Sequence, residues 1–149
     1  MPSRIARATL IVGVLDITEA CVFWFFYRGA TPMRIFQSVA AGLLGKPSFT
    51  GGAATAALGL ALHFFIAFCV VLTYALASRR LPVLTEHPVA CGAVYGVLVY
   101  LAMNFVVLPL SNAGTPKFSA ITVANGLFAH IVCVGMATAL ALSTPRRRT

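Results

Sequence analysis

Apolar residues occur along the chain in four long runs that short polar segments separate. A helix needs about 20 apolar residues to cross roughly 30 Å of hydrocarbon, so each run predicts one membrane-spanning helix. To within a few residues, the runs extend from Ala8 to Tyr27, from Ala53 to Ala77, from Pro88 to Leu110 and from Phe118 to Leu142. Little sequence lies outside them, which predicts a single integral membrane domain over residues 1–149.

The connection between the first two runs is the only one long enough to hold an element of its own. Thr31 can cap a helix that Pro32 opens, and Gly45 can end it. At helical spacing the apolar positions are Phe36, Val39 or Ala40, and Leu43, whereas Arg34, Gln37 and Ser38 lie elsewhere on the wheel. The pattern predicts an interfacial amphipathic helix over residues 32–44, too short to span. A re-entrant helix is the alternative, because "SVAAGLLG" is small and nearly uncharged.

The other connections, "SRRLPVLTEHP" and "SNAGTPK", are short and rich in turn residues, so consecutive spans should be antiparallel neighbours. The predicted fold class is therefore an all-α membrane protein, a four-helix up-down bundle with the interfacial helix between spans one and two. Small residues allow close helix contacts. The packing positions predicted on this ground are Gly59, Gly92, Gly96 and Gly126. Gly59 and Gly126 each precede a histidine by one turn, where they would leave room for a helix, water or a flat cofactor.

Composition agrees with a membrane protein, because 60% of the residues are hydrophobic and only 9% are charged, against about a quarter in soluble domains. The lipid bilayer is therefore the expected partner. The net charge of +8 forms no folded basic face, which argues against nucleic acid as a partner. The four cysteines lie one per span without a CxxC pair, and we interpret them as packing residues.

The basic residues flank the spans unequally. Seven fall on one side: Arg4, Arg7, Arg79, Arg80, Arg146, Arg147 and Arg148. Four fall on the other: Arg28, Arg34, Lys46 and Lys117. Since basic residues concentrate on the cytoplasmic side, both termini are predicted to be cytoplasmic.

The first run contains two of the three acidic residues, Asp16 and Glu19, which share one helix face. Charged groups cost about 2.5–3.5 kcal/mol at the centre of a membrane, so both should face the bundle interior. Counting a rise of about 1.5 Å per residue puts His63 and His130 at the same depth. Asn104 and Asn125 lie about 8 Å nearer the outside. The sequence predicts an intramembrane polar site made of Asp16, Glu19, His63, His130, Asn104 and Asn125, with the acids as partners of the histidines.

Several kinds of chemistry fit this set. Asp16, Glu19, His63 and His130 suit a transition metal, and the two histidines could hold a haem. A proton relay, an ion pathway or a purely structural polar core are the alternatives. No catalytic residue is predicted, because the chain has no GxSxG, HExxH or phosphate-binding loop. The expected function is ion or small-solute handling, or an accessory role in a homo-oligomer or larger membrane complex. A metal- or haem-binding redox component and a structural subunit are the alternatives.

The second to fourth runs resemble the YagU-type family of small bacterial inner-membrane proteins. The resemblance rests on a histidine followed by "FFIAFCVVLTY", a basic proline-bearing loop, a third run ending "VVLPLSNAGTP" and a fourth with glycine and "AH". The chain departs from the family in having Asn104 and no histidine in its third run, and in the segment between runs one and two. The resemblance implies a bacterial inner membrane and this helical layout, and no biochemical activity.

Overall fold

The structure is a computed structural model that describes residues 2–115 and 117–143. Its helices are α1 (Pro2–Arg28), α2 (Pro32–Leu44), α3 (Gly52–Ser78), α4 (Val83–Glu86), α5 (Pro88–Ala102), α6 (Leu108–Leu110), α7 (Ala120–Phe128) and α8 (Ala137–Leu142). A 3-10 turn, η1 (Lys46–Thr50), follows α2. Two π-helical segments, η2 (Met103–Val107) and η3 (Ala129–Met136), continue α5 into α6 and α7 into α8. The described residues form no strand, and the predicted all-α fold is confirmed.

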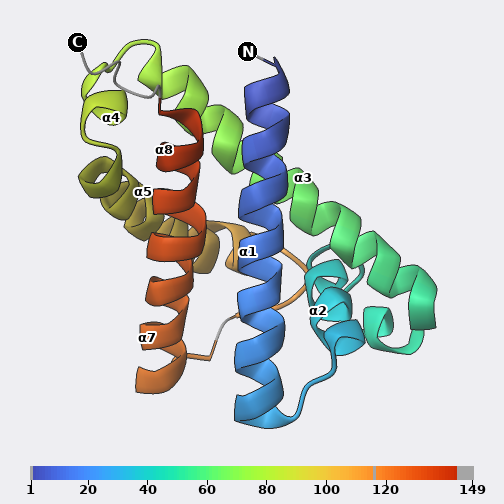
Figure 1. Ribbon diagram of the computed structural model, residues 1–149. Helices are drawn as coiled ribbons and strands as arrows, with labels where there is room; N and C mark the ends of the chain where they lie inside the picture. Colours follow the sequence, from blue (N-terminus) through green and yellow to red (C-terminus); the bar gives the residue numbers. More distant parts are fainter. Residues whose placement is uncertain (1, 116, 144–149) are drawn as a thin grey trace.

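Four helices are long and apolar enough to cross a membrane, which confirms the four predicted spans. They are Pro2–Arg28, Gly52–Ser78, Pro88–Leu110 and Ala120–Leu142. Figure 1 shows them packed as an up-down bundle. The start of α1, the short α4 and the end of α8 lie at one end of the bundle, and α2 and the start of α7 lie toward the other. The second span, α3, crosses α1 at a steep inclination.

Large apolar side chains cover the outside of the bundle. Phe26, Phe65, Val94, Phe105 and Leu110 are all more than half exposed. Each such side chain would cost about 1.5–3 kcal/mol in water relative to an apolar environment, whereas hydrocarbon solvates it. This surface is therefore suited to contact with the lipid bilayer.

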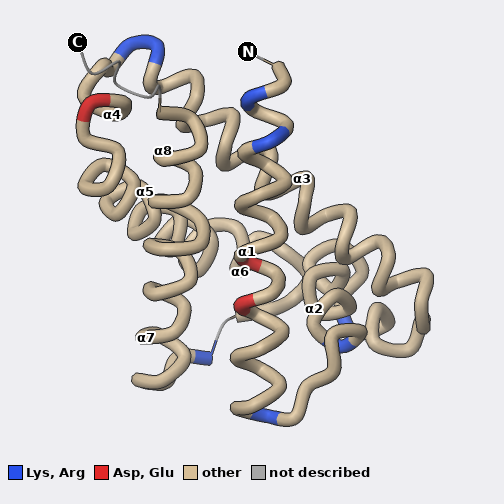
Figure 2. The backbone as a smooth tube through the Cα atoms, viewed as in Figure 1, with Lys and Arg blue, Asp and Glu red and all other residues tan. Residues whose placement is uncertain are grey.

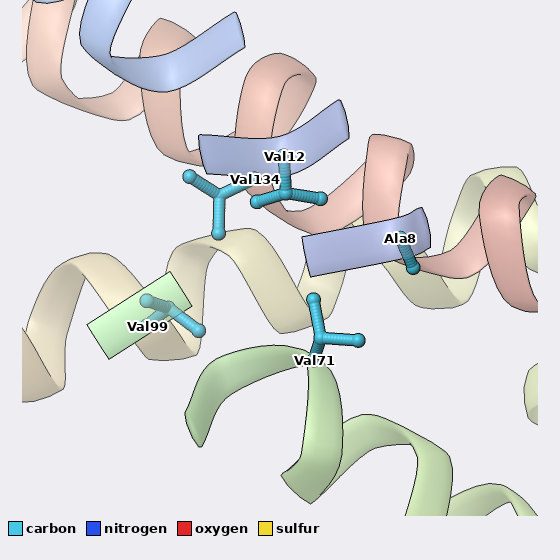
Figure 3. Close-up of a cluster of buried hydrophobic side chains, with 5 residues drawn as sticks. All are labelled: Ala8, Val12, Val71, Val99 and Val134. Atoms are coloured by element: carbon cyan, nitrogen blue, oxygen red, sulfur yellow. The ribbon is translucent and has the colours of Figure 1, made fainter. Parts of the chain in front are cut away.

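The spans meet at a small apolar cluster, the valine core, which consists of Ala8, Val12, Val71, Val99 and Val134. Figure 3 shows these side chains converging from different helices. α1 supplies the first two, and α3, α5 and η3 supply one each. Because all five side chains are small, the helix backbones approach one another closely here.

Glycines bring α5 and η3 into backbone contact. A Cβ added to Gly96 would lie against the His130 carbonyl and 2.6 Å from Cα of Ile131. A Cβ on Gly92 would lie 2.8 Å from Cα of Met136. No real Cβ approaches other atoms so closely, so a larger residue at either position would force the helices apart.

The two glycines that precede the histidines also lie at packing contacts. Gly59 of α3 lies against the backbone carbonyl of Phe36 in α2. Gly126 of α7 lies beneath the Tyr100 ring, whose nearest carbon would be 2.7 Å from an added Cβ. The space beside each glycine is therefore taken by protein.

Helix α2 begins and ends where the sequence predicts. The Thr31 hydroxyl accepts a hydrogen bond from the Arg34 backbone N–H at 3.4 Å, and Pro32 occupies the first turn. Gly45 ends the helix with φ +68°, a conformation that favours glycine. The C-terminal end of α2 is attached to the end of the third span, because the Asn112 side chain donates to the Leu43 carbonyl at 2.8 Å.

The predicted orientation of α2 is wrong at Gln37, which was expected on the polar face and is 4% exposed. The reason is a polar contact with the third helix: Gln37 Nε2 donates to the Gly52 carbonyl at 3.1 Å and to the Thr55 hydroxyl at 3.4 Å. These bonds attach the middle of α2 to the first turn of α3. Helix α2 therefore packs along α3 through a face that combines the polar Gln37 with the small residues Ala40 and Ala41.

Candidate functional site

The central feature of the site is a pairing of His63 in α3 with Asp16 in α1. Nδ1 of His63 lies 4.0 Å from Oδ2 of Asp16. Nε2 of the same ring lies 2.8 Å from the Gly13 carbonyl, one turn earlier in α1. His63 is buried, and Asp16 is partly exposed. The imidazole thus contacts two successive turns of α1.

The two partners of His63 determine where its protons lie. A carbonyl can only accept a hydrogen bond, so Nε2 carries the proton that it shares with Gly13. Nδ1 then faces the Asp16 carboxyl group at 4.0 Å, so each ring nitrogen is directed at an oxygen of α1.

The second acid has a different partner from the one expected. The Glu19 carboxyl group interacts by a hydrogen bond with the side chain of Asn125 in α7, and Asp16 lies nearby on α1. The expectation that both acids pair with the two histidines is thus wrong for Glu19. One turn of α1 separates two interhelical contacts, to α3 through Asp16 and to α7 through Glu19.

His130 and Asn104 each bond to the backbone of their own span. Nδ1 of His130 lies 2.8 Å from the Gly126 carbonyl, and Asn104 Nδ2 donates to the Tyr100 carbonyl at 2.9 Å. In both cases the side chain takes the carbonyl four residues earlier, and in both cases the residue lies in a π-helical segment. A side chain that enters the helical ladder is a known cause of such widening, and π-bulges are frequent at functional sites. The His130 ring also lies edge-on to Tyr100, with centroids 5.5 Å apart.

The predicted metal set is not assembled. Within residues 2–115 and 117–143, no three His, Cys, Asp or Glu side chains are placed to hold a metal ion. Of Asp16, Glu19, His63 and His130, only the first and third are close enough for an ion pair. Haem does not fit the histidines either, because both ring nitrogens of His63 already face α1 and neither points to an axial position.

The Asp16–His63 pair opens onto a cavity of about 510 Å³ between the spans. The polar residues on its wall are Asp16, His63 and His130, together with Arg34 and Ser38 of α2. The rest of the wall is apolar and comes from α1, α2, η1, α3, α5, η2 and η3. A cavity of this size, mainly apolar with a few convergent polar groups, has the character of a small-molecule site.

The cavity follows α1. Val12, Val99 and Val134 line it and also belong to the valine core. Trp24, about three turns farther along α1, lines it as well, so the lining extends about 18 Å along that helix.

Sequence reasoning missed the part of the wall supplied by α2 and η1. Arg34 was expected on a polar outer face, and it lines the cavity with its guanidinium carbon 4.2 Å from the centre of the Phe49 ring. Trp24 and Phe49 carried no signal beyond apolar character. A helix too short to span, joined to the spans by small residues, was the one available hint that this segment folds inward.

In comparisons with known proteins, no family model, curated protein or solved structure matches the chain. The resemblance to the YagU-type family remains a prediction.

Proposed function

We propose that this multi-pass membrane protein takes a small solute into the cavity and couples its binding to the proton held by Asp16 and His63. The observation that carries the proposal is the position of this pair on the wall of a mainly apolar cavity that all four spans line. A pair with a purely structural role needs no cavity, because packed side chains could enclose it. Here the Asp16–His63 pair faces a cavity that a solute can fill.

The orientation of the protein decides which side supplies the solute. We place both termini in the cytoplasm of a bacterium, so that the Arg34 end of the cavity faces outward. Figure 2 shows basic residues at both ends of the bundle. The described residues contribute four at each end, and Glu86 accompanies those at the end with the N-terminus. The excess on that side comes from Arg146, Arg147 and Arg148, which lie outside the described residues.

The cavity contains its own reporter, because Trp24 lines it and is the only tryptophan of the chain. Three brominated probes that quench tryptophan cover the possible ligand charges: 4-bromophenylacetate, 4-bromophenylacetamide and 4-bromophenethylamine. We expect saturable quenching by at least one probe in phosphatidylcholine nanodiscs, with a Kd that changes between pH 5.5 and pH 8.5. If none of the three quenches saturably, the solute-binding function is wrong.

Variants test whether the pH dependence belongs to the pair. His63→Gln and Asp16→Asn should bind the probe with a Kd that no longer varies with pH. The other titratable or charged groups around the pair are Glu19, His130, Cys133 and Arg34. His130→Gln is the matched control, since His130 lines the same cavity, and it should retain the pH dependence. If only His130→Gln lost the pH dependence of the Kd, the proton coupled to binding would belong to His130 and not to the pair.

A further inference from the structure

We infer that the cavity selects small amphipathic anions, carboxylates with an apolar body, and that Arg34 binds the carboxylate. This inference deepens the proposed function and depends on it. It rests on the balance of charge along the cavity wall and on the way Arg34 is held.

Only one acidic residue lines the cavity, and it already has a partner. Asp16 faces His63, with 4.0 Å between Oδ2 and Nδ1. Arg34 has no carboxylate partner among residues 2–115 and 117–143. Its guanidinium is therefore a positive charge without a carboxylate partner at the α2 end of the cavity, and anions are the ligands that this charge attracts.

The position of Arg34 adds to this preference. It is in the first turn of α2, and Ala30, Arg34 and Ile35 from this turn region line the cavity. The N-terminus of a helix carries roughly half a positive charge, which favours a nearby anion. The Phe49 ring lies over the guanidinium group and fixes its plane. The N–H groups at the edge of the guanidinium then remain directed within that plane, the geometry that binds carboxylates by two parallel hydrogen bonds.

The remaining wall suits an apolar body. Most of the other lining residues are apolar, among them Ile17, Ile35, Val39 and Ile66. These aliphatic side chains offer no hydrogen bonds, so a multiply hydroxylated solute would lose much of its hydration without compensation. A volume of about 510 Å³ limits the ligand to a small molecule, which excludes a whole phospholipid.

The three brominated probes separate the ligand charges in one assay, with Trp24 quenching in phosphatidylcholine nanodiscs. We expect 4-bromophenylacetate to bind at least about tenfold more tightly than its neutral amide, and the amine to bind most weakly. Arg34→Gln should remove the preference for the carboxylate, and Arg34→Lys should restore much of it, because the charge is retained. Arg28→Gln is the matched control: Arg28 is also exposed and lies over an aromatic ring, that of Tyr27, and it does not line the cavity.

The outcomes distinguish this inference from the function on which it rests. Equal binding of the amide and the carboxylate, or an unchanged preference in Arg34→Gln, overturns the anion inference and leaves solute binding intact. Loss of the preference in Arg28→Gln as well would show a general surface-charge effect and would also overturn it. Absence of saturable quenching by all three probes overturns both proposals.

Discussion

His63 and Asp16 face each other across α3 and α1, with 4.0 Å between Nδ1 and Oδ2, while the other ring nitrogen bonds to the Gly13 carbonyl. The contact explains how an acidic residue is accommodated in the middle of an apolar helix. The acid gains a polar partner inside the bundle, and the histidine faces an oxygen of α1 with each ring nitrogen. The same geometry makes the pair testable as a unit.

Asp16 and His63 should contribute jointly to stability. We expect Asp16→Asn and His63→Ala to be non-additive, with a coupling of about 0.5–3 kcal/mol in the free energy of unfolding, as for residues in contact. Reversible denaturation in mixed detergent micelles gives the four values of the cycle. Asp16→Asn combined with Glu86→Gln provides the control, because Glu86 is exposed in α4 and should be additive. An additive Asp16–His63 cycle would mean that the two side chains do not interact.

Glu19 should couple to Asn125 and not to His130. Removing one side of a hydrogen bond between membrane helices costs about 0.6 kcal/mol on average and up to about 1.7 kcal/mol. We therefore expect a coupling in this range between Glu19→Gln and Asn125→Ala in the free energy of unfolding. The effects of Glu19→Gln and His130→Ala on the free energy of unfolding should be additive to within about 0.3–0.5 kcal/mol. The reverse result would restore the pairing that the sequence alone suggested.

Gly96 should be intolerant of even a methyl group. In Gly96→Ala the new Cβ meets the His130 carbonyl and Cα of Ile131, backbone atoms that cannot move independently. We expect a loss of about 1–3 kcal/mol in the free energy of unfolding, typical of overpacking. Gly42→Ala is the control, since the nearest atom to its added Cβ is 3.9 Å away and alanine favours a helix. Equal stability of the two variants would contradict the close approach of α5 and η3.

The buried face of α2 can be mapped by cysteine labelling. In a background with Cys21, Cys69, Cys91 and Cys133 replaced by alanine, Arg34→Cys should react rapidly with a polar maleimide. Gln37→Cys should react far more slowly, because Gln37 is buried against the start of α3. Comparable rates at the two positions would indicate that α2 lies on the surface with its polar side in water.

The orientation in the membrane can be tested with reporter fusions. A reporter inserted at Gly114, in the exposed connection before α7, should register outside the cytoplasm. One fused after Arg148 should register in the cytoplasm, because the basic tail adds to the cytoplasmic excess. An outside signal from the tail fusion would reverse the orientation, and the Arg34 end of the cavity would then face the cytoplasm.

The sequence by itself determined the four spans, the all-α fold and the bounds of α2. These features depend on local properties. A spanning helix needs a run of apolar residues about as long as the bilayer is thick. Thr31, Pro32 and Gly45 begin and end α2 through contacts with residues within about one helical turn. The depth of Asp16 and His63 follows equally from counting along each helix. Agreement in depth was enough to suggest their pairing.

Only the tertiary structure decided which residues at similar depth meet, because that depends on the rotation and inclination of each helix. Glu19 and His130 lie at matching depths, yet rotation of the helices gives Glu19 the side chain of Asn125 and turns His130 toward its own backbone. The cavity, too, has its wall completed by α2, which packs along α3 and places Arg34 at the cavity. Helix rotation is set by contacts such as Gly96 with Ile131 and Gly59 with Phe36, and these are made between segments far apart in the chain, where hydrophobic periodicity carries no information.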